Sequence, residues 1–395
     1  MARPRSDSLA VAVLLTALVS FGPLSTDLYL PALPTLQRVF ATDAASVQFT
    51  LSVFLMGFAV AQLAMGPLSD RFGRRPVLMA GLVVYIAASV ACALAADIGQ
   101  LTAARLVQAV GACCGPVLGR AVVRDVYGRE RAARMYAYMS MAMALAPAVA
   151  PMIGGALTQG PGWRAGFALL ATLGAAALAA VWLMLEETNR HRDADATDPG
   201  RLLSNYVMLL REPTFRGYAL CFAAMFAALF AFISGSSFVL IGELGLSPVR
   251  YGMAFAAVIA GYMAGSFAAG RLTVRLGIDR MITIGLAAGC LGGFTGAGLA
   301  LAGVVSLPAI ILPVTLVMAA AGLVLPNAMA GAIAPFGTMA GTASALLGFL
   351  QMLVAALVGM AVGHFADRGP LPMMAGIAVT ALLAAVAHPG RRRLW

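Results

Sequence analysis

Two ionisable side chains, Asp27 and Arg105, each lie inside a long apolar run. A charged side chain in the middle of a membrane helix costs roughly 2.5–3.5 kcal/mol on insertion scales, and such residues usually serve a function. Arg38 and Asp97 mark the ends of the two runs. With a helical rise of about 1.5 Å per residue, Asp27 lies about 16 Å and Arg105 about 12 Å inward. We interpret Asp27 as a proton-coupling carboxylate and Arg105 as the residue that tunes it or relays its state. The alternative is a static pair that holds two helices together.

Other polar and aromatic side chains in apolar runs are candidates for lining a substrate cavity. Gln108 lies one helical turn beyond the buried arginine, and Asn327 and Gln351 lie in later runs. Tyr29 and Phe54 offer aromatic contacts for a drug-like ligand. For the amides the alternative is interhelical hydrogen bonding, and for the aromatic rings it is packing against other helices or lipid.

The sequence offers no pattern typical of an enzyme or a cofactor site. It contains no Walker loop, no nucleotide fingerprint and no nucleophile–base arrangement. His191, His364 and His388 are far apart, which argues against a metal site, and the five cysteines all lie in apolar runs. We therefore predict no catalytic residues, no metal and no cofactor.

The apolar runs indicate an all-α membrane protein. Of the 395 residues, 61% are hydrophobic and 11% charged, too few polar side chains to cover a soluble protein of this size. Runs of about 20 residues cross a bilayer core, and they are too continuous for the alternating strands of a barrel. We predict twelve transmembrane helices, at residues 9–31, 47–68, 76–96, 99–119, 134–157, 163–185, 215–241, 250–273, 281–303, 307–330, 338–362 and 370–388.

The net charge of +10 comes from arginine alone, because the chain has no lysine. Four of the 26 arginines, Arg38, Arg164, Arg250 and Arg368, fall in loops on one side of the predicted membrane. Arg105 lies within a helix, and the other 21 fall on the opposite side. The positive-inside rule makes that side cytoplasmic and places both termini there. The arginines lie in short loops between apolar runs and not along one face of a polar domain. We therefore interpret them as topology signals and expect no nucleic-acid partner.

A polar stretch and an internal repeat divide the chain into halves. We expect residues 1–186 to form a six-helix bundle, 187–213 a solvated cytoplasmic linker, and 214–395 a second six-helix bundle. Gly66–Gly73 and Gly270–Gly277 follow the second and eighth predicted helices and share Gly, Leu, Arg and Gly at identical spacing. Duplicated halves are typical of transporters that rock around a central site.

The segment Gly66–Leu78 carries the strongest local signal. Gly66 and Gly73 allow a tight loop, and Asp70 can interact with Arg71, Arg74 or a helix N-terminus. A charged latch that forms in one conformation and breaks in another can set the balance between two states. The alternative is an ordinary positively charged loop with a structural turn.

Several segments resemble motifs of the major facilitator superfamily. Gly66–Leu78 is similar to the signature loop between its second and third helices. Leu101–Gly111 resembles the fourth-helix motif of its drug–proton antiporters. Ala146–Gly155 resembles their fifth-helix motif, with Ala146 and Ala150 where glycines are common. The resemblance covers essentially the whole chain, and it implies twelve helices in two pseudo-symmetric six-helix bundles, with the first and fourth helices lining the central cavity.

Two further segments are similar to the bicyclomycin and chloramphenicol resistance (Bcr/CflA) branch of that superfamily: Ser25–Pro34 and Arg120–Tyr127. Arg124, in the second of them, joins the candidate conformational switch. The fifth-helix motif implies close packing and control of leakage by a kinked helix, and generic small-residue packing is the alternative. Its residues are Pro147, Pro151, Gly154 and Gly155.

Together these features predict a proton-coupled multidrug efflux transporter. We expect it to export small drug-like molecules by alternating access, as a monomer in a bacterial inner membrane, with protons and the lipid bilayer as its other partners. The alternative is a proton-coupled nutrient or metabolite transporter on the same fold. Such a protein would be expected to carry more polar groups in its second half than this sequence shows.

Overall fold

The computed structural model describes residues 9–127, 129–189 and 192–389, and this part of the chain contains helices and no β-strand. The predicted all-α class is therefore confirmed. The first part comprises α1 (Leu9–Val19), α2 (Phe21–Asp27), η1 (Leu30–Ala32), α3 (Leu33–Val39), α4 (Ala44–Phe72), α5 (Arg74–Leu94), α6 (Ile98–Val126), α7 (Arg129–Gln159) and α8 (Arg164–Met184). The second part comprises α9 (Pro199–Arg211), α10 (Pro213–Ser237), η2 (Phe238–Glu243), α11 (Pro248–Leu276), α12 (Ile278–Leu301), α13 (Leu307–Ile333), η3 (Ala334–Met339), α14 (Ala340–His364), η4 (Ala366–Arg368) and α15 (Leu371–Ala387).

Every predicted membrane segment overlaps helical structure, and all but the first correspond mainly to one long helix. Among the described residues, nine helices are long and apolar enough to cross a membrane, or ten if α1 and the bent stretch after it form one span. The 31-residue α7 and the 17-residue α15 occupy the remaining two predicted segments.

The prediction of one continuous helix over residues 9–31 is wrong. The chain turns at Ser20, so that α1 meets the following stretch at 43°, and after Asp27 the α-helical hydrogen bonds give way to a turn and the 3-10 helix η1. Prolines explain part of this, because Pro31 and Pro34 lack the N–H groups that would continue the ladder of hydrogen bonds. Asp27 therefore lies beside a break in the helix.

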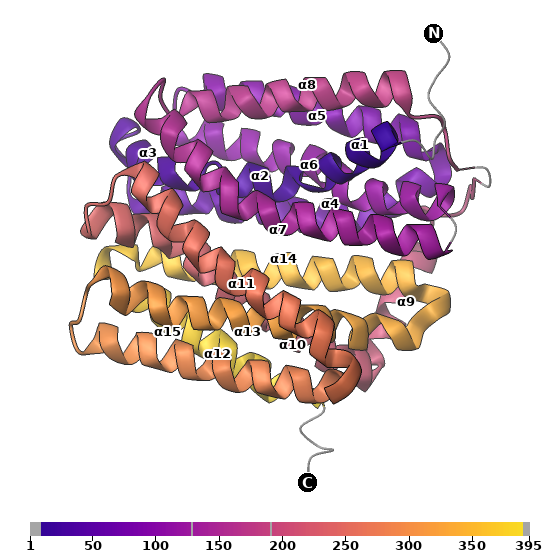
Figure 1. Ribbon diagram of the computed structural model, residues 1–395. Helices are drawn as coiled ribbons and strands as arrows, with labels where there is room; N and C mark the ends of the chain where they lie inside the picture. The colour runs from indigo at the N-terminus through magenta and orange to yellow at the C-terminus, as the bar shows by residue number, and fades with distance from the viewer. Residues whose placement is uncertain (1–8, 128, 190–191, 390–395) are drawn as a thin grey trace.

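The helices form two layers, with α1–α8 in one and α10–α15 in the other (Figure 1). Two helix pairs join the layers, since α4 packs against α14 and α7 packs against α11. Figure 1 also shows α3 and α9 at opposite ends of the molecule. In our predicted topology, the end with α3 faces outward and the end with α9 faces the cytoplasm.

The repeated loop has equivalent structure in both layers. α4 and α11 each have 29 residues, and they end at Gly73 and Gly277 with φ of 104° and 81°. The N–H group of each glycine bonds to the carbonyl four residues earlier, on Ser69 and Thr273. Positive φ is readily adopted only by glycine, which explains why this residue recurs at the same place in both halves.

Candidate functional site

Asp27 is a buried carboxylate at the last residue of α2, with 3% of its surface exposed. The Thr26 hydroxyl donates to its Oδ1 at 3.2 Å, and Asp27 has no ion-pair partner among the described residues. Tyr251 of α11 lies within its electrostatic reach. The carboxylate of Asp27 therefore stands near the seam between the layers without a compensating cation.

Arg105 is fully buried within the first layer, and its partners are neutral. Its Nη1 donates to the Ser25 carbonyl at 2.9 Å and to Oε1 of Gln108 at 2.6 Å. Its guanidinium carbon lies 4.2 Å from the ring centre of Phe54 and 4.8 Å from that of Tyr29. A desolvated cation over an aromatic face gains about 2 kcal/mol or more. Aromatic faces, a carbonyl and an amide thus surround this charge, while Nε and Nη2 have no hydrogen-bond partner among the described residues.

Asp27 and Arg105 form no salt bridge in the described structure, although both belong to the same region of the first layer. They are connected through the backbone of α2, because Arg105 binds the carbonyl of Ser25, two residues before Asp27. The arginine therefore fixes the segment that carries the carboxylate without touching the carboxylate itself.

The predicted cavity residues of the first layer surround Arg105. Gln108 also donates from Nε2 to Ser89 at 2.8 Å, and the Tyr29 hydroxyl bonds to Thr50 at 2.8 Å. Phe54 is 1% exposed and Tyr29 3%. All three side chains are buried inside the first layer, where they form the wall of the arginine site.

In the second layer, Asn327 is held by two hydrogen bonds. Its Oδ1 accepts from the Thr273 hydroxyl at 2.9 Å, and its Nδ2 donates to the Leu323 carbonyl at 2.8 Å. Gln351 on α14 is half-buried. Asn327 thus ties α13 to the end of α11, next to the repeated loop.

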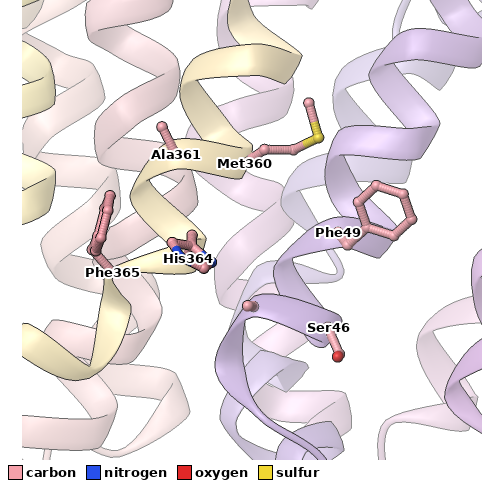
Figure 2. A pocket seen from close by; sticks show the side chains of 7 residues that line it. Ser46, Phe49, Met360, Ala361, His364 and Phe365 are labelled. Carbon is pink, nitrogen blue, oxygen red and sulfur yellow. The ribbon is translucent and has the colours of Figure 1, made fainter.

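An open surface pocket of about 540 Å³, lined only by half-buried and exposed residues, lies between α4 and α14 at the α3 end of the molecule (Figure 2). None of the five predicted cavity residues lines it. Its lining is mainly apolar and aromatic, and one histidine, His364, points into it: Ala45, Ser46, Phe49, Met360, Ala361, His364 and Phe365.

At the opposite end, Arg74 joins the ends of three helices. Its Nη1 lies 2.7 Å from Oδ1 of Asp70, at the end of α4, and its Nε lies 2.9 Å from Oδ2 of Asp125, at the end of α6. Nη1 also donates to the Ser69 hydroxyl at 2.5 Å. The Arg74 side chain is only 5% exposed and Asp125 17%, so solvent screens that contact little, whereas Asp70 is 44% exposed and its contact is screened more. Asp70 and Arg74 thus form the predicted charged contact.

The predicted linker adds a carboxylate to this cluster. Glu187 accepts hydrogen bonds from the backbone N–H groups of Arg74 at 2.9 Å and Arg75 at 3.2 Å, where a helix N-terminus favours negative charge. Asn189 donates to the Asp70 carbonyl at 2.9 Å, and Arg71 donates to Thr197 at 2.6 Å. The start of the linker is therefore bound to the loop between α4 and α5.

The other two predicted switch residues have weaker contacts. Nothing lies within 4 Å of the position that a Cβ of Gly66 would occupy. Arg124 has a side chain that is 63% exposed, and its Nε lies 3.8 Å from Asp125. Sequence analysis missed Asp125 and Glu187 as members of this cluster. Asp125 had a signal, since it lies within the segment Arg120–Tyr127, whereas Glu187 lies 113 residues from its partner and had none.

The glycines of the fifth-helix motif lie where α7 meets its neighbours. α7 continues as a helix through Pro147 and Pro151. A Cβ at Gly154 would overlap the carbonyl of Leu28, the residue after the buried carboxylate, and a Cβ at Gly155 would overlap the carbonyl of Pro248. These two glycines let α7 touch both the first predicted span and α11 of the other layer.

Comparison with known proteins gives a consistent match along the chain. Residues 13–359 match the family model described as Major Facilitator Superfamily. The chain is 31% identical to multidrug resistance protein D of Escherichia coli (88% of this chain, 86% of that one). It is 28% identical to a bicyclomycin resistance protein homolog of Haemophilus influenzae (93% and 92%). The crystal structure of a D-xylose–proton symporter has a similar fold, with a TM-score of 0.74 over 96% of this chain and 98% of that one, at 14% identity.

Proposed function

The chain belongs to the Major Facilitator Superfamily, and we propose that it exports small drug-like molecules in exchange for protons by alternating access. It is a multi-pass membrane transporter, not an enzyme. The observation that carries proton coupling is the Asp27 carboxylate, which is 3% exposed near the seam between the layers and has no ion-pair partner among the described residues. The names of its relatives, which refer to bicyclomycin and multidrug resistance, support a drug substrate.

Asp27 is placed to link protonation with opening of the seam. A charged carboxylate without a partner is costly in a dry site and cheap in water. Protonation therefore favours the closed seam, and release of the proton favours an arrangement in which water reaches Asp27. One proton that moves down about 100 mV releases about 2.3 kcal/mol, which can drive accumulation on the other side. Gly154 packs directly against the residue after Asp27, so that a change there is transmitted to α7.

We assign the switch role to the cluster around Arg74. Asp70 and Arg74 come from one loop. Asp125 of α6 pairs with the Arg74 side chain, and Glu187 of the linker accepts a hydrogen bond from the Arg74 backbone N–H. Movement of any of these helix ends would lengthen at least one charge-assisted hydrogen bond, so the cluster favours one arrangement of the first layer.

The arrangement in the membrane is part of the same proposal. We assign the bundles to residues 1–186 and 214–395 and the linker to 187–213, with both termini in the cytoplasm of a bacterial cell and one chain as the working unit. The distribution of arginines supports this orientation.

Proton movement in everted vesicles tests the proposal. A drug panel that includes bicyclomycin, chloramphenicol and lipophilic cations should collapse an inward-acid pH gradient, and Asp27→Asn should abolish this collapse at equal expression. Asp43→Asn is the matched control, because it makes the same change at an exposed residue that caps α4. Full gradient-driven export by Asp27→Asn would remove Asp27 from the coupling path. A folded wild-type protein that responds to no drug would favour the metabolite-transport alternative.

A further inference from the structure

The 13-residue helix α9 has three distinct faces, although it lies in a stretch with the composition of a solvated linker. One face packs on the protein, with Leu209 1% exposed and Tyr206 half-buried. A second face consists of Leu203, Val207 and Leu210, which are 65%, 37% and 39% exposed. The spacing of four and three residues aligns these three side chains along the helix. α9 therefore exposes an apolar stripe beside its buried face.

The third face of α9 carries both of its arginines. Arg201 and Arg211 lie at its two ends, with the exposed Ser204 and one apolar side chain, Met208 at 50% exposed, between them. Arg201 also lies 3.3 Å from Asp193, but both side chains are about half exposed or more, and such a surface pair holds the arginine only weakly. A buried face, an apolar stripe and a basic face, in that order around the helix, are typical of a helix that lies in a membrane surface.

The position of α9 along α4 places it at the level of the bilayer. The Tyr206 hydroxyl donates to the carbonyl of Leu63 at 3.5 Å. Leu63 precedes Phe72, the last residue of α4, by nine residues, which correspond to about 13 Å of helix. α9 also packs against α10 and α14, and α10 begins two residues after Arg211. The buried face of α9 therefore contacts α4 within its apolar part, and the exposed stripe lies beside that face.

We propose that α9 is a membrane-surface anchor that binds anionic phospholipid. Leu203, Val207 and Leu210 enter the acyl-chain boundary of the cytoplasmic leaflet, and Arg201 and Arg211 bind the phosphate groups of lipids such as phosphatidylglycerol. Because α9 contacts α4, α10 and α14, this anchor holds the linker at the seam where the two layers meet. The inference concerns the linker alone and stands whether or not the protein exports drugs.

Fluorescence quenching in nanodiscs tests the burial of the stripe. The full chain is labelled with an environment-sensitive fluorophore at Leu203→Cys or, as the matched control, at Ser204→Cys on the polar face. Both are placed in a Cys290→Ser background, because Cys290 is the one native cysteine in the described structure that is not buried. Spin-labelled lipid should quench position 203 several-fold more than position 204, and aqueous iodide should do the reverse. If Leu203→Cys fails to fold, Val207→Cys takes its place with the same expectation.

The lipid charge is tested by nanodiscs with and without phosphatidylglycerol. Anionic lipid should increase lipid quenching at position 203. The ratio of membrane-bound to released α9 should rise by up to about five-fold for each arginine. Arg201→Gln with Arg211→Gln should remove this increase, whereas Arg250→Gln at the other end of the molecule should keep it. Quenching of both positions by iodide alone would overturn the anchor. Protection of position 203 in detergent as well, without lipid quenching, would show that a protein surface covers the stripe and would overturn it too.

Discussion

Three buried polar side chains at the seam between α4, α10 and α14 should destabilise the structure as it stands. Gln48, Ser52 and Ser234 are each 0% exposed, and their polar side-chain atoms have no hydrogen-bond partner among the described residues. All three approach Gly359. The position that its Cβ would occupy lies 2.9 Å from Oγ of Ser234, 3.2 Å from Oγ of Ser52 and 3.4 Å from Nε2 of Gln48. Each unpaired buried group costs about 1–3 kcal/mol.

Ser52→Ala should therefore stabilise the protein by about 1 kcal/mol, after allowance for the packing that the hydroxyl loses. Ser89→Ala is the matched control. Ser89 is also 0% exposed, but its hydroxyl donates to the Tyr85 carbonyl at 2.7 Å and accepts from Gln108 at 2.8 Å. The control should destabilise the protein by about 1–3 kcal/mol, because it leaves the Gln108 amide unpaired.

The assay is thermal unfolding of both purified variants in one detergent at one scan rate, since membrane proteins often unfold irreversibly. The midpoint should rise for Ser52→Ala and fall for Ser89→Ala. If it falls by the same amount for both, the Ser52 hydroxyl is hydrogen-bonded in the native protein and the reasoning is refuted. In a transporter that alternates, about 1 kcal/mol also shifts the closed-to-open ratio about five-fold. Ser52→Ala should then lower the export rate while it raises stability.

Three other substitutions have matched controls in the chain. Gly155→Ala should impair folding or transport, because its methyl group would overlap a backbone carbonyl of α11. Gly66→Ala has open space around the new methyl group, so both the transport rate and the melting temperature should stay unchanged. Arg74→Ala should lower the free energy of unfolding by about 3 kcal/mol, because the Arg74 side chain is 5% exposed and joins two carboxylates. Arg124 is 63% exposed, so Arg124→Ala should lower it by less than about 1 kcal/mol in the same unfolding assay. Asp43→Ala should remove about 1 kcal/mol of helix capping that Asp43→Asn retains. Hydrogen bonds from Ser46 hold the pKa of Asp43 below its usual value. The stability that this cap gives the wild-type protein should therefore be lost only as the pH falls through that lowered pKa. Loss of this stability already at neutral pH would contradict the reasoning.

The helices could be predicted well because membrane crossing imposes a length and an apolar composition that few other structures share. The prediction failed in the first segment, where hydropathy stays high while the backbone breaks near Ser20 and Asp27. Hydropathy reports how apolar the side chains of a segment are. It does not report which residues lack a backbone N–H group for the helical hydrogen bonds. For the break after Asp27, Pro31 in this segment and Pro34 just beyond it contain the information that the window average hides.

The sequence predicts how deep the candidate-site residues lie along their helices, but not the direction in which their side chains point. Counting residues from the helix ends places Asp27 and Arg105 at similar levels, but it does not say which way each side chain points around its helix. The structure turns Arg105 toward Tyr29 and Phe54, two rings that the sequence suggested as contacts for a drug. Contacts such as Glu187 to Arg74 join residues more than 100 positions apart, and no local pattern identifies them.

The separation of Asp27 from Arg105 is a condition for the coupling that we propose. A buried salt bridge would stabilise the charged carboxylate in every arrangement of the seam, and breaking it would leave two unpaired charges at a cost of several kcal/mol. A proton would then have to compete with the arginine at each cycle. Arg105 is held within one layer by a carbonyl, an amide and aromatic faces, although its Nε and Nη2 have no hydrogen-bond partner among the described residues. Asp27 is left with a single hydroxyl donor, so that its protonation depends on whether water reaches it and therefore on the opening of the seam.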